Sequence, residues 1–141
     1  MVNNSVVDFV SRMKTGLKNN SKFVYVPYSF TVLKIILLLR DQGCFLYSAL
    51  IKYPLSSNAR IKVAINYING RPVFRKIELI SRPGLRVYWS IGELAKRFNR
   101  STFQGFYLIS TPKGLLLSSE IFFFYTLKRQ LSGEILVKFS L

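Results

Sequence analysis

Side chains able to carry acid–base or nucleophilic chemistry are few in this chain and lie far apart. The chain contains no histidine and one cysteine, Cys44. Without an imidazole, Cys44 has no partner to activate it as a nucleophile, and a zinc site would lack its usual Cys and His ligands. A paired-carboxylate site would need tertiary folding to join two of the six acidic residues, Asp8, Asp41, Glu78, Glu93, Glu120 and Glu134. The composition therefore predicts a protein without catalytic activity, metal or cofactor.

Two short segments carry polar groups suited to recognition. The segment 110–114, Ser-Thr-Pro-Lys-Gly, places hydroxyls and a lysine in a tight loop, where donors can face a phosphate or a base edge. The segment 81–88, Ser-Arg-Pro-Gly-Leu-Arg-Val-Tyr, combines two arginines with an aromatic ring, which suits phosphate contact and base stacking. Each has a plainer interpretation, because the first also fits an ordinary β-turn and the second an interdomain turn with solvated arginines.

Charge and hydropathy define the class of partner. The 141 residues include 21 Lys and Arg against six Asp and Glu, which gives a net charge of +15, while half of the residues are hydrophobic. Such a chain folds, and its excess charge favours a polyanion because phosphate contact releases counterions. Nucleic acid is the first candidate and an anionic membrane surface the second. The best candidate for a membrane span, 30–39, contains Lys34 and has about half the required length, so we expect no span.

The N-terminal part has the pattern of helix, strand and helix followed by further strands. Apolar residues recur at helical spacing over 5–18 and leave basic residues on the other faces. Ser29 is placed to cap a second helix, which Gly43 would end, with Cys44 beyond it as a small core residue. Asn69-Gly70 favours a type I′ hairpin turn, because both central positions of that turn need positive φ. The strands predicted here are 23–26, 44–52, 60–68 and, returning from the hairpin, 73–80.

The C-terminal part is richer in strand patterns. Its predicted strands are 85–89, 105–110, 115–117 and 133–141. Ser90 and Glu93 have the spacing of a capping box for a short helix ending near Asn99. A second short helical segment is expected from Ser118 or Ser119 to Lys128.

The Pro83-Gly84 pair marks a break between the two parts. We therefore expect two small domains, 1–80 and 81–141, in an α+β fold. The first would be a helix–strand–helix unit with a three-stranded sheet, and the second mostly β with short helices.

Taken in order, these segments resemble a known family. The run 80–88, Ile-Ser-Arg-Pro-Gly-Leu-Arg-Val-Tyr, followed by Glu93-Leu94, precedes Ile-Ser-Thr-Pro-Lys-Gly-Leu at 109–115 and Gly-Glu-Ile at 133–135. Residues 7–16 look like the first helix of the same family and residues 27–43 like its second. Over nearly its whole length, the sequence resembles the universal eighth protein of the small ribosomal subunit in its bacterial and organellar form.

The resemblance implies a two-domain α+β protein that binds ribosomal RNA early in small-subunit assembly, beside neighbouring ribosomal proteins. Its C-terminal half would grip a helix of the central domain of that RNA. The 110–114 loop would meet an irregular part of the helix, with Glu134 accepting from base amino groups or orienting a hydroxyl or a lysine. Basic residues of the first helix would reach a second stretch of RNA backbone. The implied RNA-binding residues are Ser110, Thr111, Lys113, Gly114, Glu134, Arg82, Arg86, Tyr88, Arg12 and Lys14.

Two departures from the family pattern stand out. Pro112 occupies a position where the family usually has serine, which removes a hydroxyl and a backbone N–H from the loop. Residues 121–127 are more apolar than is typical of the family, and we interpret them as surface that faces an added neighbour protein.

The compartment follows from composition and from the start of the chain. The skew toward Phe, Leu, Ile, Tyr, Ser, Asn and Lys is typical of A+T-rich coding, and the chain begins directly with the family's first helix. Both favour an organelle-encoded mitochondrial ribosomal protein over a plastid or bacterial one. The competing functional hypothesis is a basic peripheral membrane protein that binds anionic lipid, which explains charge and hydropathy but not the order of the two motifs. Under the ribosomal hypothesis the protein takes no small-molecule substrate.

Overall fold

The computed structural model describes residues 4–52, 58–82, 84–90, 93, 105–112, 114–118 and 132–140. The chain divides into two units, of which the first is Asn3–Lys76 and the second begins at Ile77. The expected domain boundary, between residues 80 and 81, lies slightly beyond this division and stays a prediction. No helix in the described part of the chain is long and apolar enough to cross a membrane.

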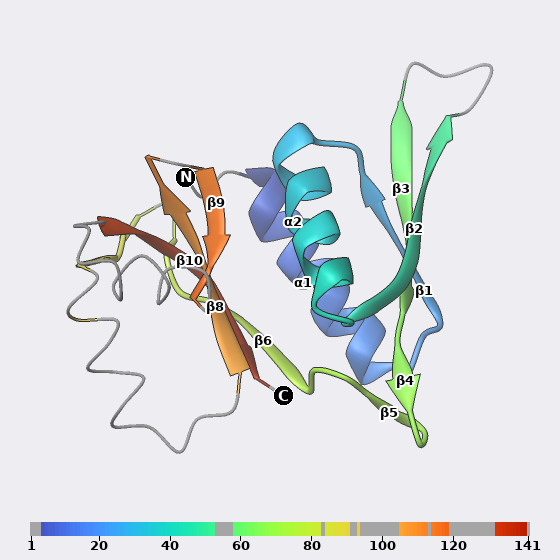
Figure 1. Ribbon diagram of the computed structural model, residues 1–141. Coiled ribbons are helices and arrows are strands. Elements are labelled where there is room, and N and C mark those ends of the chain that lie inside the picture. The colour runs from blue at the N-terminus through green and yellow to red at the C-terminus, as the bar shows by residue number, and fades with distance from the viewer. Residues whose placement is uncertain are drawn as a thin grey trace. The chain divides into compact units, whose positions relative to one another are not determined.

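The first unit packs two helices against one face of a three-stranded antiparallel sheet (Figure 1). Its sheet has the strand order β1-β3-β2, so the first strand in sequence pairs with the third. The predicted helix–strand–helix order and three-stranded sheet are confirmed. The elements are α1 (Asn4–Lys18), β1 (Phe23–Pro27), α2 (Phe30–Asp41), β2 (Phe45–Lys52) and β3 (Ala59–Ile65).

Hydrophobic periodicity explains why these segments take these forms. Apolar residues three and four apart place one stripe of each helix toward the sheet, whereas strand β1 alternates exposed and buried positions. Each fully buried side chain of this size stabilises the fold by about 1.5–3 kcal/mol. The buried hydrophobic residues of the two helices and β1 are Val6, Phe9, Val10, Met13, Val32, Ile35, Ile36, Leu39, Val24 and Val26.

Both helices end in the same backbone motif. Gly43 follows the C-cap of α2 with φ +82°, and the N–H groups of Gly43 and Cys44 donate to the carbonyls of Arg40 and Leu39 at 2.9 and 3.0 Å. This is a Schellman ending, in which a left-handed residue lets the chain reverse over the last helical carbonyls. Asn20, with φ +53°, occupies the corresponding position after α1. Gly43 therefore ends α2 as the sequence predicted.

The start of α2 differs from the expectation in one respect. Ser29 is the N-cap residue, but its side chain makes no capping hydrogen bond. Its carbonyl accepts the first helical bond from the Leu33 N–H at 2.9 Å. The position of the cap is confirmed. Because the Ser29 hydroxyl makes no capping hydrogen bond, it does not add the stabilisation that such a bond normally supplies.

Cys44 lies in the core, as predicted. Its side chain is fully buried, and burial raises the pKa of the thiol to about 11. The raised pKa follows from desolvation, which penalises the thiolate. Cys44 thus stays protonated at neutral pH.

The Asn69-Gly70 turn has the predicted geometry, but the strand after it does not continue the hairpin. Asn69 and Gly70 have φ of +54° and +77°, as a type I′ turn requires. The turn joins only two-residue strands, β4 (Tyr67–Ile68) and β5 (Arg71–Pro72). One further ladder bond follows, from the Val73 N–H to the Asn66 carbonyl at 3.1 Å, and the chain then leaves the hairpin.

The predicted returning strand, 73–80, is therefore wrong as a single element. The chain leaves the hairpin after β5 and forms β6 (Lys76–Leu79), which joins the sheet of the C-terminal half. The partner of this segment is a strand far along the sequence, β10, and local patterns do not reveal such a pairing.

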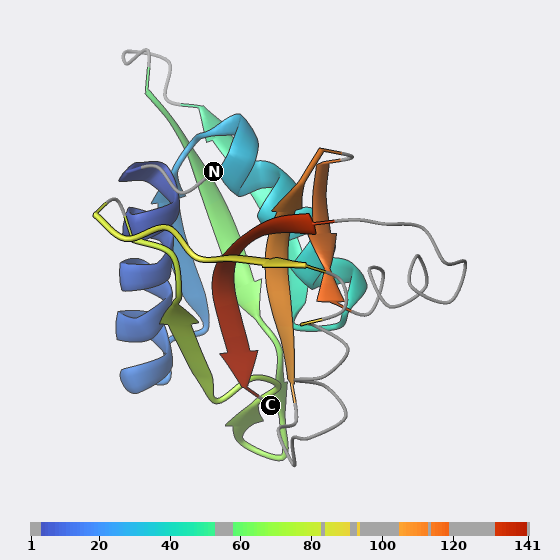
Figure 2. The same cartoon turned by 90° about the vertical axis from the view of Figure 1, so that its left-hand side faces the viewer.

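The second unit contains a five-stranded sheet built around β10. Its strand order is β6-β10-β8-β9, and β7 also pairs with β10. In Figure 2, β10 is the red strand beside the orange β8. The elements after β6 are β7 (Tyr88–Ser90), β8 (Gly105–Thr111), β9 (Gly114–Leu117) and β10 (Ser132–Ser140). The expected α+β class is confirmed.

Details of this unit refine the sequence expectations. The strand expected over 85–89 starts only at Tyr88, because residues before it close a turn. The Glu93 N–H donates to Ser90 Oγ at 3.3 Å, which is the expected capping bond. The rest of that helix lies outside the described residues, as does nearly all of the segment predicted from Ser118 or Ser119 to Lys128.

Replacing Gly43 with alanine should lower the free energy of unfolding by about 1 kcal/mol, because a Cβ is strained at this positive φ. No atom lies within 4 Å of the added Cβ, so the conformation alone is tested. Urea denaturation provides the measurement. Gly84→Ala is the control, since that position is equally open but lacks a positive φ. Equal effects of the two substitutions would contradict the assignment.

Candidate nucleic-acid interface

Three of the expected site residues meet in one row across the second sheet. Glu134 on β10 lies directly opposite Tyr88 on β7 and opposite Ser110 on β8. Directly opposed residues of antiparallel strands project from the same face of a sheet. Tyr88 is 65% exposed, Ser110 is half-buried and Glu134 is buried. The row therefore presents an aromatic ring and a hydroxyl on either side of a sheltered carboxylate.

An arginine accompanies the carboxylate. Arg86 Nη1 lies 3.2 Å from Glu134 Oε1, and the exposed fractions of the two side chains are 30% and 7%. A carboxylate this deeply buried needs a charged partner to offset its desolvation. Glu134 was expected to accept from base amino groups or to orient a hydroxyl or a lysine. The partner that the structure places against it is an arginine, Arg86, which the expectation did not name.

The Ser110-to-Gly114 segment is the turn that joins β8 to β9. Thr111 pairs with Gly114 across the turn, and Thr111 Oγ1 donates to the Gly114 carbonyl at 2.8 Å. Gly114 has φ +110°, which favours glycine at this position. The threonine hydroxyl thus fixes the shape of the turn. Lys113 lies outside the described residues.

The Arg82 turn is closed by backbone bonds. Arg82 and Leu85 exchange two N–H to carbonyl hydrogen bonds of 2.9 Å each. The buried Ser81 hydroxyl accepts the Val87 N–H at 2.9 Å and anchors the turn to the strand that follows. Arg82 itself is exposed. Ser81 is a positioning residue that was not expected from the sequence, although a serine two residues before a Pro-Gly pair is a signal for it.

Gly133 is a second residue whose importance emerges only from the structure. A Cβ at this position would lie 2.6 Å from the Ser110 carbonyl oxygen and 2.7 Å from Ile109 Cγ2. The absence of a side chain therefore permits β10 to approach β8 beside the row. On the opposite face, Ile109 and Ile135 form the buried centre of an apolar cluster that supports these strands.

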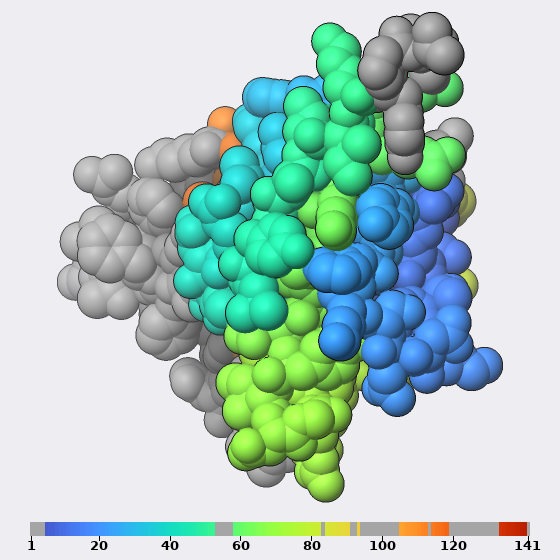
Figure 3. All heavy atoms as spheres, turned by 90° about the vertical axis from the view of Figure 1, so that its right-hand side faces the viewer, coloured from blue at the N-terminus to red at the C-terminus, as the bar shows by residue number. Residues whose placement is uncertain are grey.

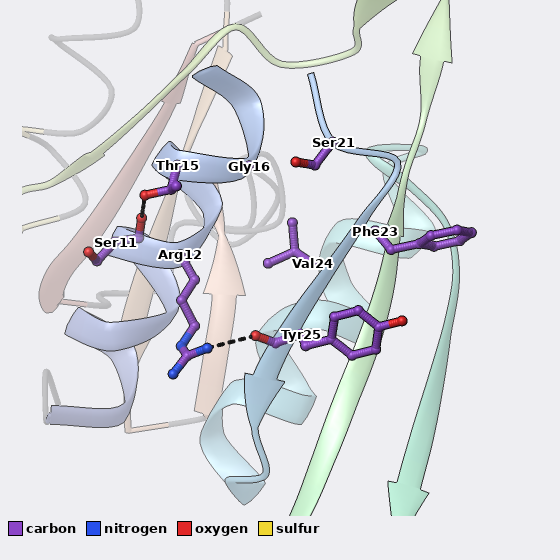
Figure 4. A pocket seen from close by; sticks show the side chains of 8 residues that line it. All are labelled: Ser11, Arg12, Thr15, Gly16, Ser21, Phe23, Val24 and Tyr25. Carbon is purple, nitrogen blue, oxygen red and sulfur yellow. Dashed lines mark hydrogen bonds between the residues drawn. The ribbon is translucent and has the colours of Figure 1, made fainter. Parts of the chain in front are cut away.

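Arg12 and Lys14 belong to the first unit, whereas the other expected site residues belong to the second. Arg12 Nε is 2.9 Å from Asp8 Oδ2, and its Nη1 donates to the Tyr25 carbonyl at 3.1 Å. Lys14 is exposed on α1. Arg12 lies at a hollow of about 340 Å³ between α1 and β1. Figure 4 shows the side chains that line it. The hollow is lined by Ser11, Arg12, Thr15, Gly16, Ser21, Phe23, Val24 and Tyr25.

Comparison with known proteins decides the family. A sequence profile described as ribosomal protein S8 matches residues 4–139. The chain belongs to the ribosomal protein S8 family. Two bacterial relatives are each named small ribosomal subunit protein uS8. That of Anaplasma marginale strain Florida is 34% identical over 93% of this chain and 92% of its own. That of Protochlamydia amoebophila is 28% identical over 96% of both chains.

Membership in the S8 family confirms the main functional expectations. S8 proteins are structural, non-enzymatic constituents of the small ribosomal subunit, with ribosomal RNA and ribosomal proteins as partners. The ribosomal hypothesis is thereby confirmed over the peripheral membrane hypothesis. The relatives compared are bacterial, and nothing in the comparison points to a mitochondrion.

In this S8-family chain, Gly133→Ala should lower the free energy of unfolding by about 1–3 kcal/mol, because the new methyl group would collide with the backbone of β8. Thermal denaturation followed by circular dichroism should show a melting temperature several degrees below that of the parent. Gly84→Ala, which adds a methyl group in open space, is the matched control. A Gly133→Ala variant as stable as the parent would contradict the close approach of the two strands.

Proposed function

We propose that this protein binds a helix of the central domain of small-subunit ribosomal RNA and thereby supports assembly of the subunit. The single observation that carries the proposal is the register that aligns Tyr88, Glu134 and Ser110 across three strands. Family membership supplies ribosomal RNA as the general partner. The row supplies a compact set of groups suited to an irregular RNA surface.

The groups of the row have different tasks in this proposal. Ser110 carries a hydroxyl that both donates and accepts, so it can contact a base edge or a sugar hydroxyl. The exposed ring of Tyr88 offers a stacking surface. Glu134 orients Arg86, whose guanidinium suits a phosphate. The β8–β9 turn, with Thr111, Lys113 and Gly114, forms the edge that approaches the RNA, and Arg82 adds a further phosphate contact.

Basic residues of α1 supply a second contact in the same proposal. Lys14 is exposed and suits a phosphate as a flexible point charge. Arg12 is held by Asp8 and by the Tyr25 carbonyl, which limits the directions in which its guanidinium can reach RNA. Contacts to phosphate position the protein without reading the sequence of the RNA.

The test is a salt titration of binding to a central-domain RNA fragment, followed by fluorescence anisotropy between about 50 and 200 mM salt. Ser110→Ala and Glu134→Gln should each raise Kd for this fragment by about tenfold, because they remove a direct contact and the anchor of Arg86. Lys14→Ala should instead flatten the salt slope by about one unit, since one phosphate contact is lost.

Ser140→Ala is the matched control, because it removes a hydroxyl from the other end of β10. Kd for a generic RNA duplex, measured in parallel, distinguishes a loss of specific recognition from a loss of general charge attraction. If Ser110→Ala and Glu134→Gln bind the fragment like the parent, or lose affinity equally for both RNAs, the assignment of the row is wrong.

We also propose that the protein acts in mitochondria. The support is the skew of composition toward residues with A+T-rich codons. Mass spectrometry of purified mitochondrial small subunits from the source cells should then recover peptides of this chain in amounts equal to other small-subunit proteins. Recovery with plastid particles, or from a bacterial cytoplasm, would contradict the proposal.

A further inference from the structure

The sheet of the first unit has an outer face that its helices leave uncovered. Strand register places Phe23 and Tyr47 on either side of Ala64, and Tyr25 beside Lys62. Since β1 buries Val24 and Val26 toward the helices, its alternate residues project outward. Figure 3 views this unit from the side on which β1, β2 and β3 lie. Together, these strands form an outer aromatic face that consists of Phe23, Tyr25, Tyr47, Arg60 and Lys62.

The rings of this face form a connected surface. The ring centroids of Phe23 and Tyr47 lie 6.3 Å apart with a tilt of 53° between the planes. Ala64 lies between them on the central strand and is 2% exposed, so its small side chain allows both rings to approach over it. Phe23, Tyr25 and Tyr47 are 39%, 42% and 44% exposed, which leaves a large part of each ring accessible.

Cations are set among these rings. Lys62 Nζ lies 4.1 Å from the centroid of the Phe23 ring, within the range of a cation–π contact. Arg60 follows two residues earlier on the same strand, hence on the same face, and is exposed. The three strands contain no Asp or Glu. The face is thus aromatic and uniformly positive.

This combination distinguishes between two kinds of occupant. Lysine is depleted in protein–protein interfaces, yet Lys62 lies on the central strand in the middle of the face. Unpaired RNA matches the surface better, because its bases expose flat faces for stacking while its phosphates need cations. A duplex fits less well, since its base faces are stacked inside the helix.

We propose that the outer aromatic face binds an unpaired RNA segment, with bases stacked on Phe23, Tyr25 and Tyr47 and phosphates at Lys62 and Arg60. That this RNA is ribosomal rests on the proposed function, whereas the stacking chemistry does not. The surface is separate in its residues from the Tyr88, Glu134 and Ser110 row of the second unit.

The experiment uses the whole protein and a fluorescent oligouridylate of about 12 nucleotides, a length within the range that single-strand-binding folds occupy. Tyr25→Leu and Tyr47→Leu should each raise Kd for this probe by at least about fivefold, because a stacking ring is lost. Binding to an RNA duplex of equal length should change by less than about twofold, since phosphate contacts remain.

Phe30→Leu is the matched control, because Phe30 is a 65% exposed ring with Lys34 Nζ 4.5 Å from its centroid, but lies on α2. It should leave Kd for the oligouridylate unchanged. Leucine keeps apolar volume at each exposed position, and circular dichroism verifies that every variant folds. As a second readout, cross-linking of 4-thiouridine-containing probe should label peptides that contain Phe23, Tyr25 or Tyr47.

The proposal is overturned if both tyrosine variants bind the oligouridylate like the parent, or if they lose affinity equally for the duplex. Cross-links confined to other peptides would also overturn it and leave a protein as the occupant of this face. The same variants should bind the central-domain helix fragment normally. If Ser110→Ala did not weaken binding of the central-domain fragment, that result would count against the proposed function alone, because the oligouridylate contains no helix.

Discussion

The pairing of β10 on both of its edges is the constraint on which the second unit depends. Tyr88, Ser110 and Glu134 are distant in sequence, and only the shared ladder through β10 brings them into one row. Gly133 makes this possible, because any side chain there would strike the backbone of β8. The apolar cluster around Ile109 and Ile135 supports the opposite face of the same strands. The row on one face is therefore held in place by apolar packing on the other.

Two of the few acidic residues in this basic chain form ion pairs with arginine. In a chain with net charge +15, an acidic residue on a nucleic-acid-binding surface works against association unless it has a partner. Asp8 and Glu134 each lie against an arginine, at 2.9 and 3.2 Å. Each pair fixes the direction of a guanidinium whose five donors form a rigid fork. Asp8 and Glu134 thus reduce the net positive charge slightly, and each orients an arginine side chain.

Much of the fold could be predicted because it depends on neighbours in sequence. The helix stop at Gly43 and the turn at Asn69-Gly70 follow from local backbone preferences. The strand after the hairpin could not be predicted, because its partner β10 is remote and nothing local specifies that choice. The Arg86–Glu134 pair was missed for the same reason. The outer aromatic face requires the register of three strands before Phe23 and Tyr47 are seen to be adjacent.

The position of β10 in the chain also determines the order in which this protein acquires its surfaces during synthesis. The first unit takes all its strands and helices from segments that precede β6, and domains generally fold as units, N-terminal first, while the chain is being made. The second sheet has its central strand last among its five, so β6, β7 and β8 each lack a partner strand until β10 has been made. A nascent chain would therefore display the outer aromatic face while the Tyr88, Glu134 and Ser110 row does not yet exist. The direction of translation therefore sets the order in which the two surfaces form. The sheet of the first unit becomes available to a partner before the sheet of the second unit.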